Sequence, residues 1–161
     1  MRRLAASFFL IASCLFAQAP AIAGPPDDVR EAVFRYQMRQ CIPAPPVRRA
    51  AVYFLSFGYE AMGGAKFTDP SAAFMKRFAG ARPLVRAESA SVYAQYARKD
   101  RATGRLGPLL VIWQIKALKS NKAVVKGEII AGLLLAADYE YTLTNDGKRW
   151  RVASSETLGS T

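Results

Sequence analysis

Residues 109–154, LLVIWQIKALKSNKAVVKGEIIAGLLLAADYEYTLTNDGKRWRVAS, decide the fold class, because apolar and polar side chains alternate along most of this stretch. A period of two residues is typical of β-strands that bury one face. Turn-forming residues interrupt the alternation at Ser120 and Asn121, and again at Asn145, Asp146 and Gly147. The stretch therefore predicts two β-hairpins.

The alternation also predicts which side chains share a face of each strand. In the first hairpin, one face of the first strand carries Val111, Trp113, Ile115 and Ala117. One side of the returning strand carries Lys122, Val124, Lys126 and Glu128. In the second hairpin, Tyr139, Tyr141 and Leu143 alternate with Asp138, Glu140 and Thr142.

The first half of the chain predicts two helices. Apolar residues recur at three- and four-residue steps from Asp27 to Gln40, after two acidic residues that suit a helix N-terminus. Asp69 followed by Pro70 predicts a second, short helix of two to three turns, which Gly80 ends. The apolar run from Ala50 to Phe57 predicts a strand between them.

Residues 88–97 are expected to form another strand and residues 99–107 a basic loop. Helices followed by a run of strands predict one α+β domain, with an N-terminal helix and a short second helix packed on a curved antiparallel sheet of about four to six strands. The expected domain covers residues 24–157, and residues 158–161 are expected to form a tail.

The N-terminus predicts export. A short cationic start, an apolar run from Leu4 to Phe16 and small residues around position 23 form a signal peptide over residues 1–23, with Gly24 as the mature N-terminus. The apolar run is too short to span a bilayer, so no transmembrane span is expected. The protein is therefore expected to be periplasmic or secreted. The alternative is a lipoprotein anchored through Cys14, since residues 11–14 resemble a lipobox.

Composition excludes several kinds of chemistry. The chain has no histidine, so neither a catalytic Ser-His-Asp or Cys-His arrangement nor a histidine-bearing zinc site can form. Cleavage of the signal would leave Cys41 as the single cysteine, which excludes a thiolate metal site. No metal and no cofactor are expected. The net charge of +11 makes this a basic protein that is attracted to anionic envelope components, whereas export argues against a physiological nucleic-acid partner.

The order of elements resembles the nuclear transport factor two-like (cystatin-like) cone folds, in which the closing strands carry a pattern such as Gly147, Trp150 and Val152. The chain also resembles small exported bacterial proteins of uncharacterised function. The matching stretches are Asp69–Gly80, Lys99–Gly107 and Lys126–Val152. These relatives often carry cysteines at the positions of Ala131 and Leu135, and a glycine near Asp138. The resemblance implies no catalytic residue.

Three carboxylates and two tyrosines are the candidate catalytic groups. Glu128, Asp138 and Glu140 lie on strands that pair in the predicted sheet, beside Tyr139 and Tyr141. Paired carboxylates perform acid-base chemistry when burial raises the pKa of one of them. The alternative is that these carboxylates form ordinary cross-strand ion pairs with lysines and arginines on a solvated face.

A basic cluster is the candidate anion-binding site. It consists of Arg98, Lys99, Arg101 and Arg105. Arginine side chains in a loop can bind phosphate or carboxylate through two parallel hydrogen bonds. The alternative is an ordinary solvated loop.

Two functions remain open at this point. The first is a non-enzymatic binding or accessory protein for an anionic or small-molecule envelope partner. The second is a small isomerase- or hydrolase-like enzyme that uses a pocket carboxylate with a tyrosine. Ten aromatic residues could line a pocket in either case, namely Tyr53, Phe57, Tyr59, Phe67, Phe74, Phe78, Trp113, Tyr139, Tyr141 and Trp150.

Overall fold

The computed structural model describes residues 26–40, 50–94, 97–132 and 135–160. The predicted signal peptide, Cys14, Gly24 and Cys41 lie outside these ranges. The helical elements are α1 (Pro26–Gln40), α2 (Ala72–Lys76) and the 3-10 helix η1 (Glu88–Ala90). The strands are β1 (Val52–Ala61), β2 (Gly64–Thr68), β3 (Leu84–Ala87), β4 (Ser91–Ala94), β5 (Ala97–Asp100), β6 (Leu106–Gly107), β7 (Leu109–Leu118), β8 (Lys122–Gly132), β9 (Leu135–Asn145) and β10 (Trp150–Ser160).

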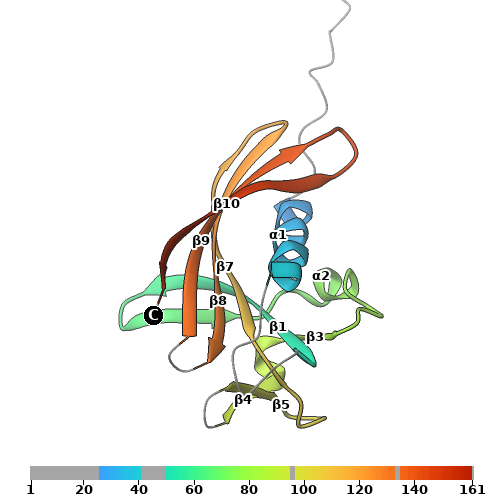
Figure 1. Cartoon of the computed structure of the whole chain (residues 1–161), viewed down its shortest axis with the longest axis vertical. Coiled ribbons are helices and arrows are strands. Elements are labelled where there is room, and N and C mark those ends of the chain that lie inside the picture. Colours follow the sequence, from blue (N-terminus) through green and yellow to red (C-terminus); the bar gives the residue numbers. More distant parts are fainter. Residues whose placement is uncertain (1–25, 41–49, 95–96, 133–134, 161) are drawn as a thin grey trace, which may run out of the picture.

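A seven-stranded sheet forms the centre of the fold (Figure 1). Its strands follow the order β10-β9-β8-β7-β1-β2, and β3 pairs with the first half of β1 on the same edge as β2. The four strands from β7 to β10 form an antiparallel meander, as the two predicted hairpins require. β1 instead runs parallel to both β7 and β3. The sheet is therefore mixed.

The predicted α+β fold with an antiparallel sheet of four to six strands is wrong. The described residues form ten strands in two sheets, a mixed seven-stranded one and a three-stranded β4-β5-β6 sheet, with only two α-helices, so the fold is mostly β. Side-chain alternation is the same in parallel and antiparallel strands, so the sequence carried no signal for the parallel pairing of β1. The short strands β2, β3, β5 and β6 were missed because each has few residues in which alternation can be recognised.

Helix α1 covers one face of the large sheet, named here the helix face. Its first turn carries the expected acidic residues, and its buried side contains Val29, Val33, Phe34 and Gln37. These side chains pack on alternate residues of the strands, including Leu110, Val125, Tyr141 and Leu143, to form the main core. Figure 1 shows α1 alongside the sheet and α2 to the lower right of α1. The predicted N-terminal helix is thus confirmed.

Helix α2 is shorter than predicted and begins at a different cap. Ser71, not Asp69, caps the helix, because its hydroxyl oxygen accepts a hydrogen bond of 3.1 Å from the backbone N–H of Phe74. Asp69 instead accepts a 3.0 Å hydrogen bond from the backbone N–H of Ser89. Arg77, just after the helix, donates to Asp28 at 2.6 Å and to Glu31 at 2.9 Å. These contacts hold α2 against α1.

The opposite side of the large sheet, named here the second face, has its own smaller core of Val52, Phe54, Leu109 and Val111. Arg98 of the three-stranded sheet reaches this side, where its guanidinium lies 6.0 Å from the ring centroid of Phe67. Gly107 of β6 lies so close to Val52 that a Cβ atom on it would be 1.8 Å from the Val52 carbonyl oxygen. In Figure 1, β4 and β5 lie at the end of the molecule opposite the β7–β8 and β9–β10 turns.

Three further boundaries differ from the expectation. The segment predicted as a strand over residues 88–97 is broken by η1, and the predicted basic loop contains part of β5 and all of β6. Residues 158–160, predicted as a tail, belong to β10, where Gly159 pairs with Asp138 and Ser160 with Ala137. None of the helices in the described part of the chain is long and apolar enough to cross a membrane.

Candidate functional site

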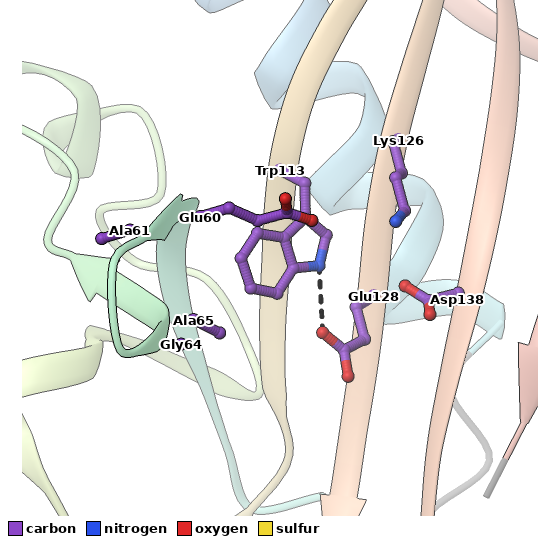
Figure 2. Close-up of a pocket in the computed structure, with 8 residues that line it drawn as sticks. All are labelled: Glu60, Ala61, Gly64, Ala65, Trp113, Lys126, Glu128 and Asp138. Atoms are coloured by element: carbon purple, nitrogen blue, oxygen red, sulfur yellow. Dashed lines mark hydrogen bonds between the residues drawn. The ribbon is translucent and has the colours of Figure 1, made fainter.

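A cavity of about 400 Å³ opens on the second face, between the β1–β2 hairpin and strands β7 to β9 (Figure 2). Its polar groups are three carboxylates and one ammonium. The lining residues are Glu60, Ala61, Gly64, Ala65, Trp113, Lys126, Glu128 and Asp138. Two of the predicted carboxylates, Glu128 and Asp138, are therefore in the cavity, together with a third that the sequence did not single out, Glu60.

A β-bulge sets the position of Trp113. Ile112 pairs with Gly127 and Gln114 pairs with Lys126, so Trp113 is an extra residue that opposes no residue of β8. A bulge bends its strand and redirects the side chains around it. The indole consequently lies over the neighbouring strand β1, on the second face, where it joins the partly buried side chains around the smaller core.

Gly58 of β1 provides the surface on which the indole rests. A Cβ atom at this position would lie 2.4 to 2.8 Å from three ring carbons of Trp113, so any other residue would displace the ring. Phe67 of β2, the register partner of Gly58, packs on the indole with a centroid distance of 5.8 Å. One face of the indole is therefore covered, and the ring lines the cavity.

Glu128 is hydrogen-bonded to Trp113. The indole Nε1–H donates a 3.0 Å hydrogen bond to Glu128 Oε2 (Figure 2). Burial raises the pKa of Glu128 above its ordinary value, and the negative charge of Asp138 raises it further, against lowering contributions from the Trp113 hydrogen bond and Lys126. Asp138 faces Glu128 directly across the β8–β9 ladder. Like charges at directly opposed positions repel each other.

Gln37 of α1 supports the bulge from the helix face. Its amide Nε2 donates to the carbonyl oxygens of Val111 at 3.4 Å and Glu128 at 3.3 Å, and to the Tyr141 hydroxyl at 3.2 Å. Gly127 leaves space for this amide, because a Cβ atom there would be 3.2 Å from Gln37 Nε2 and 2.8 Å from the Val111 carbonyl oxygen. The two strands that carry Trp113 and Glu128 are thus held together by a buried side chain on the other face.

The remaining catalytic candidates do not join the cavity. Tyr139 and Tyr141 stack on each other at 5.8 Å within the helix-face core, so the sheet separates them from Glu128 and Asp138. Glu140 shares the second face but forms an ion pair of 2.5 Å with Lys116 and does not line the cavity. The structure therefore assembles two of the five candidates, and it does not assemble a carboxylate with a tyrosine.

The basic cluster does not form a single site. Arg98 is only 7% exposed, forms an ion pair with Glu88, donates to Ser91 at 2.9 Å and stacks over Tyr93 at 4.6 Å. Arg101 donates from Nε to the Ser91 carbonyl oxygen at 3.1 Å. Lys99 and Arg105 are exposed. Arg98 has a structural role, because its charge is already neutralised inside the small sheet.

Residues that sequence reasoning missed include Glu60 and Lys126 as cavity residues. Lys126 was placed correctly on the same side as Glu128, but only as a partner for carboxylates. Glu60 had no signal, because the β1–β2 hairpin that brings it to the cavity was not predicted. Of the ten aromatic candidates, Trp113 alone is among the described residues that line this cavity.

Comparisons with protein families, with curated proteins and with solved structures found no match to this chain. Within the described residues, no group of three or more Asp, Glu, His or Cys side chains is arranged to hold a metal ion. The site must therefore be interpreted from its own geometry.

Proposed function

We propose that this chain is an exported, non-enzymatic binding protein that takes a small organic cation in the cavity on the second face. The observation that carries the proposal is the sign of the charge in the cavity. Three carboxylates and one lysine line it, in a chain whose net charge is +11. A local reversal of charge in a concave site attracts ligands of the opposite sign.

The contacts of the lining residues support a cation in particular. Glu60 and Asp138 form no ion pair or side-chain hydrogen bond with another described residue, and Asp138 faces the carboxylate of Glu128. A bound cation would relieve this repulsion. No arginine or lysine of the described residues stacks on Trp113. Its indole can therefore provide a cation–π contact, for which tryptophan is the best of the aromatic side chains.

An enzyme that uses a carboxylate and a tyrosine is less well supported. The raised pKa of Glu128 fits an acid-base group. Its expected partners, Tyr139 and Tyr141, lie on the helix face. A binding role requires only the groups that the cavity already contains.

Choline and its uncharged isostere 3,3-dimethylbutanol test the proposal by isothermal titration calorimetry. Choline is expected to bind and the isostere is not. The W113L variant should lower choline affinity by about two- to thirty-fold, because a cation–π contact contributes about 0.5–2 kcal/mol. Glu140→Gln is the matched control, since Glu140 is on the same face outside the cavity. The affinity of this variant for choline should be the same as that of the native protein. Equal affinity for choline and the isostere, or none for either at millimolar concentration, would contradict the proposal.

Choline affinity is also expected to fall as the pH is lowered. The fall should begin at a pH above the ordinary glutamate pKa of about 4.3. The cation needs the ionised carboxylate, and burial raises the pKa of Glu128, so this carboxylate is protonated first. Calorimetry across a pH series should show the early fall in the native protein. In E128Q, the fall should begin only at lower pH. An unchanged pH profile in E128Q would contradict a role for Glu128 in binding.

Export is part of the proposal and has its own test. Mass spectrometry of the protein recovered from the envelope of a bacterial host should show a species that begins at Gly24. A species that begins at Cys14 and carries lipid would replace this assignment with a membrane anchor, and an unprocessed chain in the cytoplasm would contradict export altogether.

A further inference from the structure

A second cavity lies between α2, β3 and η1. Its volume is about 680 Å³, and it is separate from the cation cavity, with which it shares no lining residue. Most of the wall is apolar, from side chains such as Met75, Phe78, Leu84 and Val85 together with several alanines. Two cationic residues, Lys76 and Arg86, also line it, and no carboxylate does among the described lining residues.

The two cations differ from the nearby Arg77 in how they are paired. Arg77 is neutralised by Asp28 and Glu31. Lys76 is exposed and forms no ion pair with any described residue. Arg86 is half-buried and pairs with Phe54, so its side chain starts on the second face. There its positive charge helps to lower the pKa of Asp100, which is lowered mainly by the Thr103 hydroxyl. Arg86 forms no ion pair within 4.0 Å in the described part of the chain.

The wall that carries Lys76 is fixed in place. Phe74 and Phe78 pack on each other with ring centroids 5.6 Å apart, and both are buried in the main core. Ser71 caps α2, and Arg35 donates a 2.8 Å hydrogen bond to the Arg77 carbonyl oxygen at its end. A site whose walls are already ordered loses little conformational entropy when a ligand binds.

We infer that this cavity binds an anionic single-chain amphiphile, a fatty carboxylate, with its alkyl chain against the apolar wall and its carboxylate at the Lys76 ammonium. Apolar lining accounts for the chain, because burial of methylene groups away from water is favourable. The unpaired Lys76 ammonium accounts for the head group, since hydrogen bonds to charged groups are stronger than neutral ones. The inference is independent of the cation site.

The probe is dodecanoate below its critical micelle concentration, measured by isothermal titration calorimetry against dodecanol. Dodecanoate is expected to bind more tightly than dodecanol by about 10- to 150-fold, because a charge-assisted hydrogen bond contributes about 1.5–3 kcal/mol. K76E should remove this advantage. Lys148→Glu, in the exposed β9–β10 turn, changes the net charge equally and should leave binding unchanged.

Three results would overturn the inference. Equal binding of dodecanol and dodecanoate would show that the head group is not recognised. Equal losses in K76E and Lys148→Glu would show only general charge attraction. Binding to anionic phospholipid vesicles without binding of monomeric dodecanoate would identify a membrane surface as the partner. Thermal melting of K76E provides the folding control, and W113L, which is expected to weaken only choline binding, separates the two sites.

Discussion

Replacing Phe34 with alanine is expected to lower the free energy of unfolding by about 3–5 kcal/mol. Phe34 is fully buried at the centre of a four-ring cluster, with centroid distances of 6.1 Å to Phe57, 6.0 Å to Phe74 and 6.4 Å to Phe78. These rings come from α1, β1 and the α2 segment, so the cluster joins all three. Urea denaturation followed by circular dichroism measures the loss.

The matched control for this variant is Arg77→Ala, which removes the ionic connection between the same two helices. Arg77 is 32% exposed and its partners Asp28 and Glu31 are 38% and 24% exposed. Ion pairs with this exposure are worth about 0–1 kcal/mol. Arg77→Ala should therefore cost much less than F34A. If the two variants lost the same stability, ion pairing and not aromatic burial would hold α2 in place.

Replacing Gly107 with alanine is expected to destabilise the protein by about 3 kcal/mol or more, at the upper end of the usual cost of overpacking. The added Cβ atom would lie 1.8 Å from the Val52 carbonyl oxygen and 2.7 Å from its carbonyl carbon. Both atoms are backbone in a fully buried residue, so a rotation of side chains cannot relieve the overlap. Thermal unfolding followed by circular dichroism would detect the loss.

Gly159 provides the control for this substitution. A Cβ atom at Gly159 meets nothing within 4 Å, and its backbone does not need a positive φ. G159A should leave stability unchanged or raise it by less than about 1 kcal/mol, because alanine restricts the unfolded chain. Tolerance of alanine at Gly107 would contradict the close packing of β6 on β1, and with it the position of the small sheet.

The sequence predicted the elements whose pattern is long and regular. The helix predicted from Asp27 to Gln40 is present as α1, and the hairpins of β7–β8 and β9–β10 were expected. The alternation of β8 correctly placed Lys126 and Glu128 on one face. The parallel partners of β1 could not be predicted, because alternation does not depend on strand direction. The overall fold class was therefore wrong although many of its parts were right.

The β7 pattern was wrong for a specific reason. Val111 and Trp113 lie on the second face as expected, but Ile115 packs in the helix-face core. The bulge at Trp113 shifts the alternation by one residue, and a second irregularity between Ile115 and Ala117 shifts it again. An apolar strand gives no sign of an extra residue, because apolar side chains suit both faces.

The separation of carboxylates from tyrosines was, in contrast, predictable. Asp138 and Tyr139 are consecutive residues of a strand, and consecutive side chains point to opposite faces. The same alternation that predicted β9 therefore excludes a site that contains both. The contribution of Glu60 was not predictable, because Glu60 lies more than 50 residues before Trp113 in the sequence, on a hairpin whose pairing was not predicted.

Because Trp113 is the unpaired residue of a bulge, the proposed cation site depends on a one-residue insertion in the β7–β8 ladder. Deletion of a single codon would remove the indole and let Ile112 and Gln114 face Gly127 and Lys126 as consecutive pairs. Pairing from Leu109 to Ile112 would be unaffected. In an alignment of homologous chains, the presence or absence of the indole would then be visible as a gap at position 113, while the residues of the sheet core remained aligned.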